Sequence, residues 1–88
     1  MQSARNGPFN PRTEIHYQLP EATHVTLTVY NLLGQKIRSL IDEHQESGAY
    51  TVHWDGCDEN GSAAASGVYL YAISAGEFRQ VKKMVLVR

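Results

Sequence analysis

The sequence has few of the residues that rigidify or stabilise small proteins: it contains one cysteine, three prolines and one tryptophan among 88 residues. A single cysteine, Cys57, excludes an intrachain disulfide and leaves no thiolate pair for a structural zinc ion. No apolar run approaches the roughly 20 residues that a membrane-spanning helix needs, so we expect no transmembrane segment. The first residues also lack the apolar stretch of a secretory signal peptide.

The size and composition indicate one folded domain. Apolar residues make up 42% of the chain and charged residues 19%, which is typical of a folded protein and not of a disordered one. A core of this size leaves little room for a large cleft. We expect residues 1–6 to be the remnant of a linker and residues 7–88 to form the single domain.

Charge is distributed unevenly along the chain. Four of the eight basic residues, Arg79, Lys82, Lys83 and Arg88, lie in the last ten positions, which hold no acid. This segment therefore carries +4, and the rest of the chain carries −5 to give the total of −1. Because no aromatic residue is interleaved with these cations and the total is negative, we expect no nucleic-acid partner.

Alternation of apolar and polar residues predicts a series of short strands. The expected strands are residues 13–19, 24–30, 35–41, 50–54, 67–74 and 78–87. Residues 35–41 also fit a helical spacing, but a run this short between two turns favours a strand. Residues 67–74 are apolar on both faces, which predicts a central strand covered on both sides. Lys82 and Lys83 interrupt the alternation of the last strand, where we expect a β-bulge.

Turn-forming residues separate these strands. Residues 7–11 predict a rigid, extended start in which two prolines flank Phe9. Asn31 and Gly34 predict a hairpin with a bulge. The polar residues 42–48 predict a loop, and residues 55–66 predict a long connection. Six or seven strands with such turns predict an all-β antiparallel sandwich.

Metal-binding residues occur without the spacing that metal sites need. Three histidines, His16, His24 and His53, fall on outward faces of the predicted strands. No two of them lie two residues apart on one strand or four apart on a helix, the spacings at which histidines bind one metal ion. We therefore expect them to be exposed and not to bind a metal. Asp58 and Asn60 fit the end of a calcium loop. Glycines stand where that loop needs its first and last ligands, so we expect ordinary turn chemistry there.

Catalytic patterns are also missing from the sequence. It has no Gly-x-Ser-x-Gly elbow, no cysteine with a positioned base and no glycine-rich phosphate loop. Its neighbouring carboxylates fall in predicted exposed turns, where burial cannot tune them for acid–base catalysis. We therefore expect neither an enzyme nor a bound cofactor or metal.

The aromatic residues of the strands leave two alternatives open. Tyr50, Trp54, Tyr69 and Tyr71 could form an exposed platform that binds sugars, or they could fill the core. Alternating positions in a small sandwich favour the core for Trp54. For Tyr69 and Tyr71, which share a face, both alternatives remain.

Several stretches, taken in order, resemble the type A C-terminal sorting domain of the type IX secretion system. These stretches are residues 7–11, 13–20, 25–34, 54–56, 66–71 and 83–88, and the motif residues among them are Pro8, Phe9, Asn10, Pro11, Gly34, Trp54, Asp55, Gly56, Gly67, Tyr69 and Tyr71. The chain departs from that family at Asn6 and Gly7, where the family usually has Pro-Asn.

The resemblance implies an immunoglobulin-like (Ig-like) sandwich of about seven strands that acts as a monomeric, non-catalytic export signal. It would carry a covalently linked upstream cargo domain through an outer-membrane translocon, and a sortase-like peptidase would then cleave it. The implied location is secreted or on the cell surface, reached through the periplasm and outer membrane. The candidate translocon contacts are Lys82, Lys83, Met84, Val85, Leu86, Val87 and Arg88.

Two other groups share this strand pattern. It is similar to the Ig-like domain of flagellar hook-capping proteins and to accessory domains of bacterial surface hydrolases. The alternative function is therefore an Ig-like accessory, carbohydrate-binding or structural module of a secreted hydrolase.

Overall fold

The computed structural model describes residues 13–87, which form six antiparallel strands in two sheets. The strands are β1 (Thr13–Leu19), β2 (Thr23–Tyr30), β3 (Lys36–Gln45), β4 (Gly48–Trp54), β5 (Gly67–Ala75) and β6 (Phe78–Leu86). Within this part of the chain there is no helix long and apolar enough to cross a membrane. The predicted all-β sandwich is confirmed, with six strands in the described part against the expected total of about seven.

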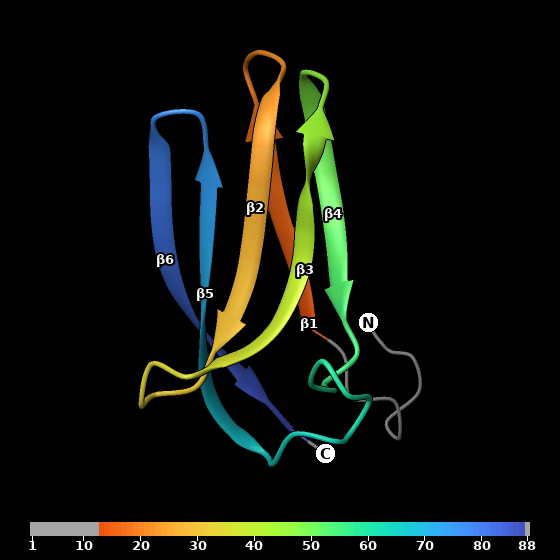
Figure 1. Ribbon diagram of the computed structural model, residues 1–88, viewed down its shortest axis with the longest axis vertical. Coiled ribbons are helices and arrows are strands. Elements are labelled where there is room, and N and C mark those ends of the chain that lie inside the picture. Colours follow the sequence, from red (N-terminus) through yellow and green to blue (C-terminus); the bar gives the residue numbers. More distant parts are fainter. Residues whose placement is uncertain (1–12, 88) are drawn as a thin grey trace.

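The two sheets differ in size. Four strands form the larger sheet in the order β3-β2-β5-β6, and β1 pairs with β4 in the smaller one. Figure 1 shows the β1–β4 pair behind β2 and β3, with β5 and β6 extending to one side. The smaller sheet therefore covers only part of the larger one, and β6 lies at the end of the larger sheet.

The core lies between the sheets and is built from alternate residues of the strands. Val25, Leu27 and Val29 of β2 are fully buried, as are Ile15 of β1 and Trp54 of β4. Leu19, Tyr69, Ile73, Ala75, Met84 and Leu86 complete this buried cluster. Burial of a large aliphatic side chain stabilises a fold by about 1.5–3 kcal/mol, so β2, with three such residues, anchors the domain.

The β2–β3 hairpin confirms the predicted turn. Asn31 Oδ1 accepts hydrogen bonds from the main-chain N–H groups of Leu33 and Gln35, each at 2.9 Å. Gly34 has a φ of +83°, a left-handed conformation that glycine adopts without a steric penalty. The register shifts twice along β2 and β3, as expected for bulges.

β3 is longer than predicted. The expected loop at residues 42–48 is wrong except at Glu46 and Ser47, because Asp42 to Gln45 pair with Thr26 to Thr23 of β2 and β4 already begins at Gly48. His24 Nε2 also lies 2.6 Å from Asp42 Oδ1 across the two strands. Long-range pairing thus overrides the polar composition of this segment.

β5 is central in its sheet, but its two faces differ. Tyr69, Ile73 and Ala75 point into the core, whereas Leu70 and Ala72 are half-buried on the outer face. The expectation that both faces are covered is therefore wrong. The outer face is apolar and shielded by β2 and β6 on either side, while no described residue forms a layer over it.

β6 pairs with β5 in one continuous register, from Gly67 opposite Leu86 to Ala75 opposite Phe78. The predicted bulge at Lys82 and Lys83 is therefore wrong. Lys82 falls on the inward side of the strand, where its side chain is nevertheless exposed. Because the smaller sheet leaves that stretch uncovered, the strand can place a lysine there without a bulge.

Candidate binding surface

β6 combines a firmly packed end with an open edge. Met84 and Leu86 are buried in the core, and they fix the strand against the rest of the sandwich. On the outer face, Val81 and Val85 are 63% and 59% exposed. Within residues 13–87, β6 pairs with β5 alone, so its other side presents unpaired main-chain groups.

The same strand carries exposed positive charge. Arg79, Lys82 and Lys83 are exposed, and no carboxylate of the described residues forms an ion pair with any of them. We call Arg79, Val81, Lys82, Lys83 and Val85 the basic edge. The predicted contact residues Lys82, Lys83 and Val85 are thus exposed, whereas Met84 and Leu86 serve the core.

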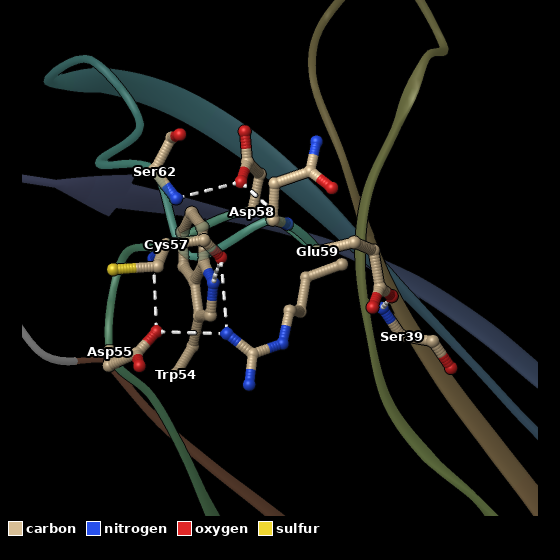
Figure 2. Close-up of polar contacts among 9 residues, drawn as sticks. Ser39, Trp54, Asp55, Cys57, Asp58, Glu59 and Ser62 are labelled. Atoms are coloured by element: carbon tan, nitrogen blue, oxygen red, sulfur yellow. Dashed lines mark hydrogen bonds and ion pairs between the residues drawn. The ribbon is translucent and has the colours of Figure 1, made fainter.

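At the opposite edge of the sheet, the 55–62 loop covers the first part of β3, from Ile37 to Ser39. The N–H of Glu59 donates to the carbonyl of Ile37 at 3.1 Å, and the N–H of Ser39 donates to Glu59 Oε2 at 2.5 Å. Arg38 Nη1 also donates to Asp55 Oδ1 at 3.3 Å. Figure 2 shows Glu59 reaching Ser39 from the loop. These contacts occupy main-chain groups of β3 that would otherwise be available to another strand.

Short polar contacts hold this loop in shape. Asp58 Oδ1 accepts from the N–H groups of Asn60 and Ser62 at 2.9 and 3.0 Å, and Asp55 Oδ1 accepts from that of Cys57 at 3.0 Å (Figure 2). These are turns capped by aspartate side chains, as predicted for this segment. Gly56, with a φ of +80°, turns the chain at the start of the loop.

Trp54 and Tyr69 belong to the core. Trp54 is fully buried, and its ring meets that of Tyr69 edge to face with centroids 5.2 Å apart. Trp54 Nε1 donates to the carbonyl of Cys57 at 2.9 Å, and the Tyr69 hydroxyl donates to that of Ala65 at 2.6 Å. An exposed sugar platform is therefore wrong for these two residues. Tyr71 is half-buried on the same strand.

Tyr17 and Tyr50 form a second aromatic pair on the smaller sheet. Their rings stack with centroids 5.3 Å apart and planes 15° from parallel. The Tyr17 hydroxyl donates to Oε1 of the buried Gln45 at 2.5 Å. Burial raises the pKa of Tyr17 above its ordinary value, because the phenolate is poorly solvated there.

The histidines lie on the surface beside carboxylates. His16 and His53 flank Glu14, at 3.2 and 3.0 Å, and the hydrogen bond from His53 is the main cause that lowers the pKa of the Glu14 carboxyl. His44 lies 3.4 Å from Glu46. Over residues 13–87 no group of three or more potential ligands is arranged to hold a metal ion.

The sequence did not reveal a hollow at one end of the sandwich. It measures about 610 Å³ and lies between the β1–β2 and β5–β6 turns, where Leu19, Pro20, Ala75 and Phe78 contribute apolar walls. These turns are far apart in the chain, so no local pattern could have joined them. Several predicted motif and contact residues lie outside the described part of the chain, namely Pro8, Phe9, Asn10, Pro11 and Arg88, as does the expected linker at 1–6.

Comparison with known proteins identifies a relationship to flagellar proteins. A family model described as the FlgD Ig-like domain matches residues 7–77. The fold is similar to the crystal structure of FlgD from P. aeruginosa, with a TM-score of 0.66 and 20% sequence identity. That match covers 85% of this chain and 59% of the FlgD chain, so this chain spans less than two thirds of that structure. A search of curated proteins found no match.

These findings correct the resemblance to a type IX sorting domain. The family model is that of the FlgD Ig-like domain, and the solved structure shares this fold, so the sorting function, the translocon, the sortase-like peptidase and the cargo partnership are wrong. The error has a physical origin, because the sequence motifs follow the strands and turns of an Ig-like sandwich, which both groups share. The similarity to flagellar Ig-like domains is confirmed. With the family model covering most of its length, this chain belongs to the FlgD Ig-like domain family.

Proposed function

We propose that this chain is a non-catalytic, structural module of a flagellar hook-capping protein. The observation that carries the proposal is the match of the FlgD Ig-like family model to residues 7–77. The similarity to the fold of FlgD from P. aeruginosa supports it. The chain would act as one Ig-like unit of that protein, at a secreted, cell-surface position on the growing hook.

The polar groups of the domain support a structural role. Asp55, Asp58 and Glu59 accept hydrogen bonds that shape the 55–62 loop and cap β3. Glu14 and Asp42 lie beside histidines of neighbouring strands. Each of these carboxylates has a partner that stabilises a strand or turn, which is the arrangement expected of a module that holds its shape.

The test is genetic and uses the full-length parent protein in its native host. We expect deletion of this domain to reduce the number of assembled hooks seen by electron microscopy, because the cap would lose one of its structural units. Antibody labelling of the parent protein should fall on nascent hooks. The variant Lys36→Ala, at an exposed position whose side chain has no ion-pair partner among residues 13–87, serves as the control in the same host and should leave hook assembly unchanged. Normal hooks in the deletion strain, together with no labelling of hooks, would contradict the proposal.

A further inference from the structure

The two edges of the four-stranded sheet differ in how available they are. At β3, the 55–62 loop occupies the carbonyl of Ile37 and the N–H of Ser39. At β6, no described residue pairs with the outer side of the strand. Unpaired N–H and C=O groups along an ordered strand form a ready site for an added strand. Among residues 13–87, the outer side of β6 is unpaired along the whole strand, and this edge carries the basic residues, whereas the start of the β3 edge is occupied.

The side chains of β6 define what such a strand must carry. Val81, Lys83 and Val85 share the outer face, and Lys82 lies on the other face. The exposed valines favour apolar neighbours in an added strand, and the cations favour carboxylates directly opposite. Since Arg79, Lys82 and Lys83 have no ion-pair partner among residues 13–87, a partner's carboxylates would not have to displace one.

We propose that the basic edge of β6 binds an extended acidic segment of a partner protein, which adds to the sheet as a fifth strand. The segment would alternate apolar and acidic residues on the face that meets Val81, Lys83 and Val85. This goes beyond the proposed function, because it specifies a partner chemistry and does not depend on a flagellar location.

Charge argues against two other occupants of this edge. Residues 1–12 of the chain contain Arg5 and Arg12, no acid and two prolines, so they offer neither the charge nor the continuous main-chain donors of the proposed segment. A second copy of β6 in antiparallel pairing would place lysines near lysines. An acidic segment from another protein satisfies both the main-chain groups and the charges.

The binding test uses the 88-residue chain and a synthetic peptide. The peptide places valine opposite Val81 and Val85, glutamate opposite Arg79, Lys82 and Lys83, and threonine elsewhere. Fluorescence anisotropy should show saturable binding that weakens as salt rises towards about 1 M. A peptide of the same composition in scrambled order, and one with N-methylated edge amides, should both bind at least about tenfold more weakly. Equal binding of either control peptide would overturn the proposal.

Matched variants of the chain locate the site. Lys83→Glu should weaken peptide binding by about tenfold, because it replaces an attraction with a repulsion. Lys36→Glu makes the same charge change at the exposed start of β3 and should leave binding within about twofold. Circular dichroism of both variants checks that they fold. An equal loss in the two variants would contradict a site on β6.

The alternative occupants give distinct results. If peptide binding appeared only after deletion of residues 1–12, the chain's own segment would be the occupant and the proposal would be wrong. Concentration-dependent dimers that Lys83→Glu alters would assign the edge to a second copy. Tighter binding of the chain to anionic phosphatidylserine vesicles than to the peptide would assign it to a lipid surface. If the parent protein were absent from hooks but the chain still bound the peptide, only the proposed function would be rejected.

Discussion

Trp54 connects the core to the loop that follows it. Its ring is buried against Tyr69, and its Nε1 donates to the carbonyl of Cys57. We expect Trp54→Phe to destabilise the domain by about 1–3 kcal/mol, because the carbonyl loses a donor and the ring loses volume. Trp54→Ala should cost about 3–5 kcal/mol. Urea unfolding followed by circular dichroism measures both, and the neighbouring exposed variant His53→Ala should stay within about 1 kcal/mol. Equal stability of Trp54→Phe and the parent chain would contradict this prediction.

Tyr17 gives the domain a dependence on alkaline pH. Burial raises the pKa of its phenol in the folded state, so the unfolded chain loses this proton at a lower pH than the folded one. Stability from this group is therefore complete below the unfolded pKa of about 10 and is lost as pH rises towards the folded pKa. Unfolding by urea at pH 8 to 11 should show a steeper loss for the parent chain than for Tyr17→Phe. Parallel pH profiles would contradict this prediction.

At the scale of elements, the 55–62 loop acts as a cover for the β3 edge, and Asp58 holds its turn. Asp58→Ala removes the acceptor for two N–H groups and should destabilise the domain by about 1–2 kcal/mol. Asp58→Asn keeps an acceptor oxygen in the same place and should lie within about 0.5 kcal/mol of the parent chain. Thermal unfolding of both variants checks this. Similar losses of stability in Asp58→Ala and Asp58→Asn would mean that the charge of Asp58, and not its hydrogen bonds in the turn, stabilises the domain.

Local alternation of apolar and polar residues predicts most of the strands, but it does not predict which strands pair or which faces are covered. The apolar residues of β1, β2 and β4 occupy the face that the period of two assigned to the core. The end of β3 was missed because Asp42 to Gln45 are polar, and their pairing with β2 depends on residues far away in the chain. The outer face of β5 was misjudged for a related reason. An apolar face shielded laterally by neighbouring strands has the same composition as one covered by a second layer.

The sequence predicts the side chains of the candidate surface but not its open strand edge. The cluster of Lys82 and Lys83 marked the last strand as unusual, and Val81 and Val85 were correctly placed on one face of it. Whether that strand has an open edge depends on the strand order β3-β2-β5-β6, which no local pattern contains. Strand and turn motifs identify an Ig-like sandwich more readily than they separate its families, so the resemblance in the sequence indicates the fold correctly and the family wrongly.

At the scale of the whole molecule, the two edges of the larger sheet are protected by different means. A loop covers the start of β3, whereas β6 carries like charges that oppose pairing with another copy. We expect Lys82→Thr combined with Lys83→Thr to increase self-association relative to the parent chain. The substitutions remove the repulsion and supply residues that favour strands, next to the exposed Val81 and Val85. Sedimentation velocity over a range of concentrations should show larger species for the double variant. Lys36→Thr, at the start of β3, should behave as the parent chain does, because it leaves β6 unchanged. If the double variant sedimented like the parent chain at every concentration, the lysines would not be what keeps this edge from pairing with itself.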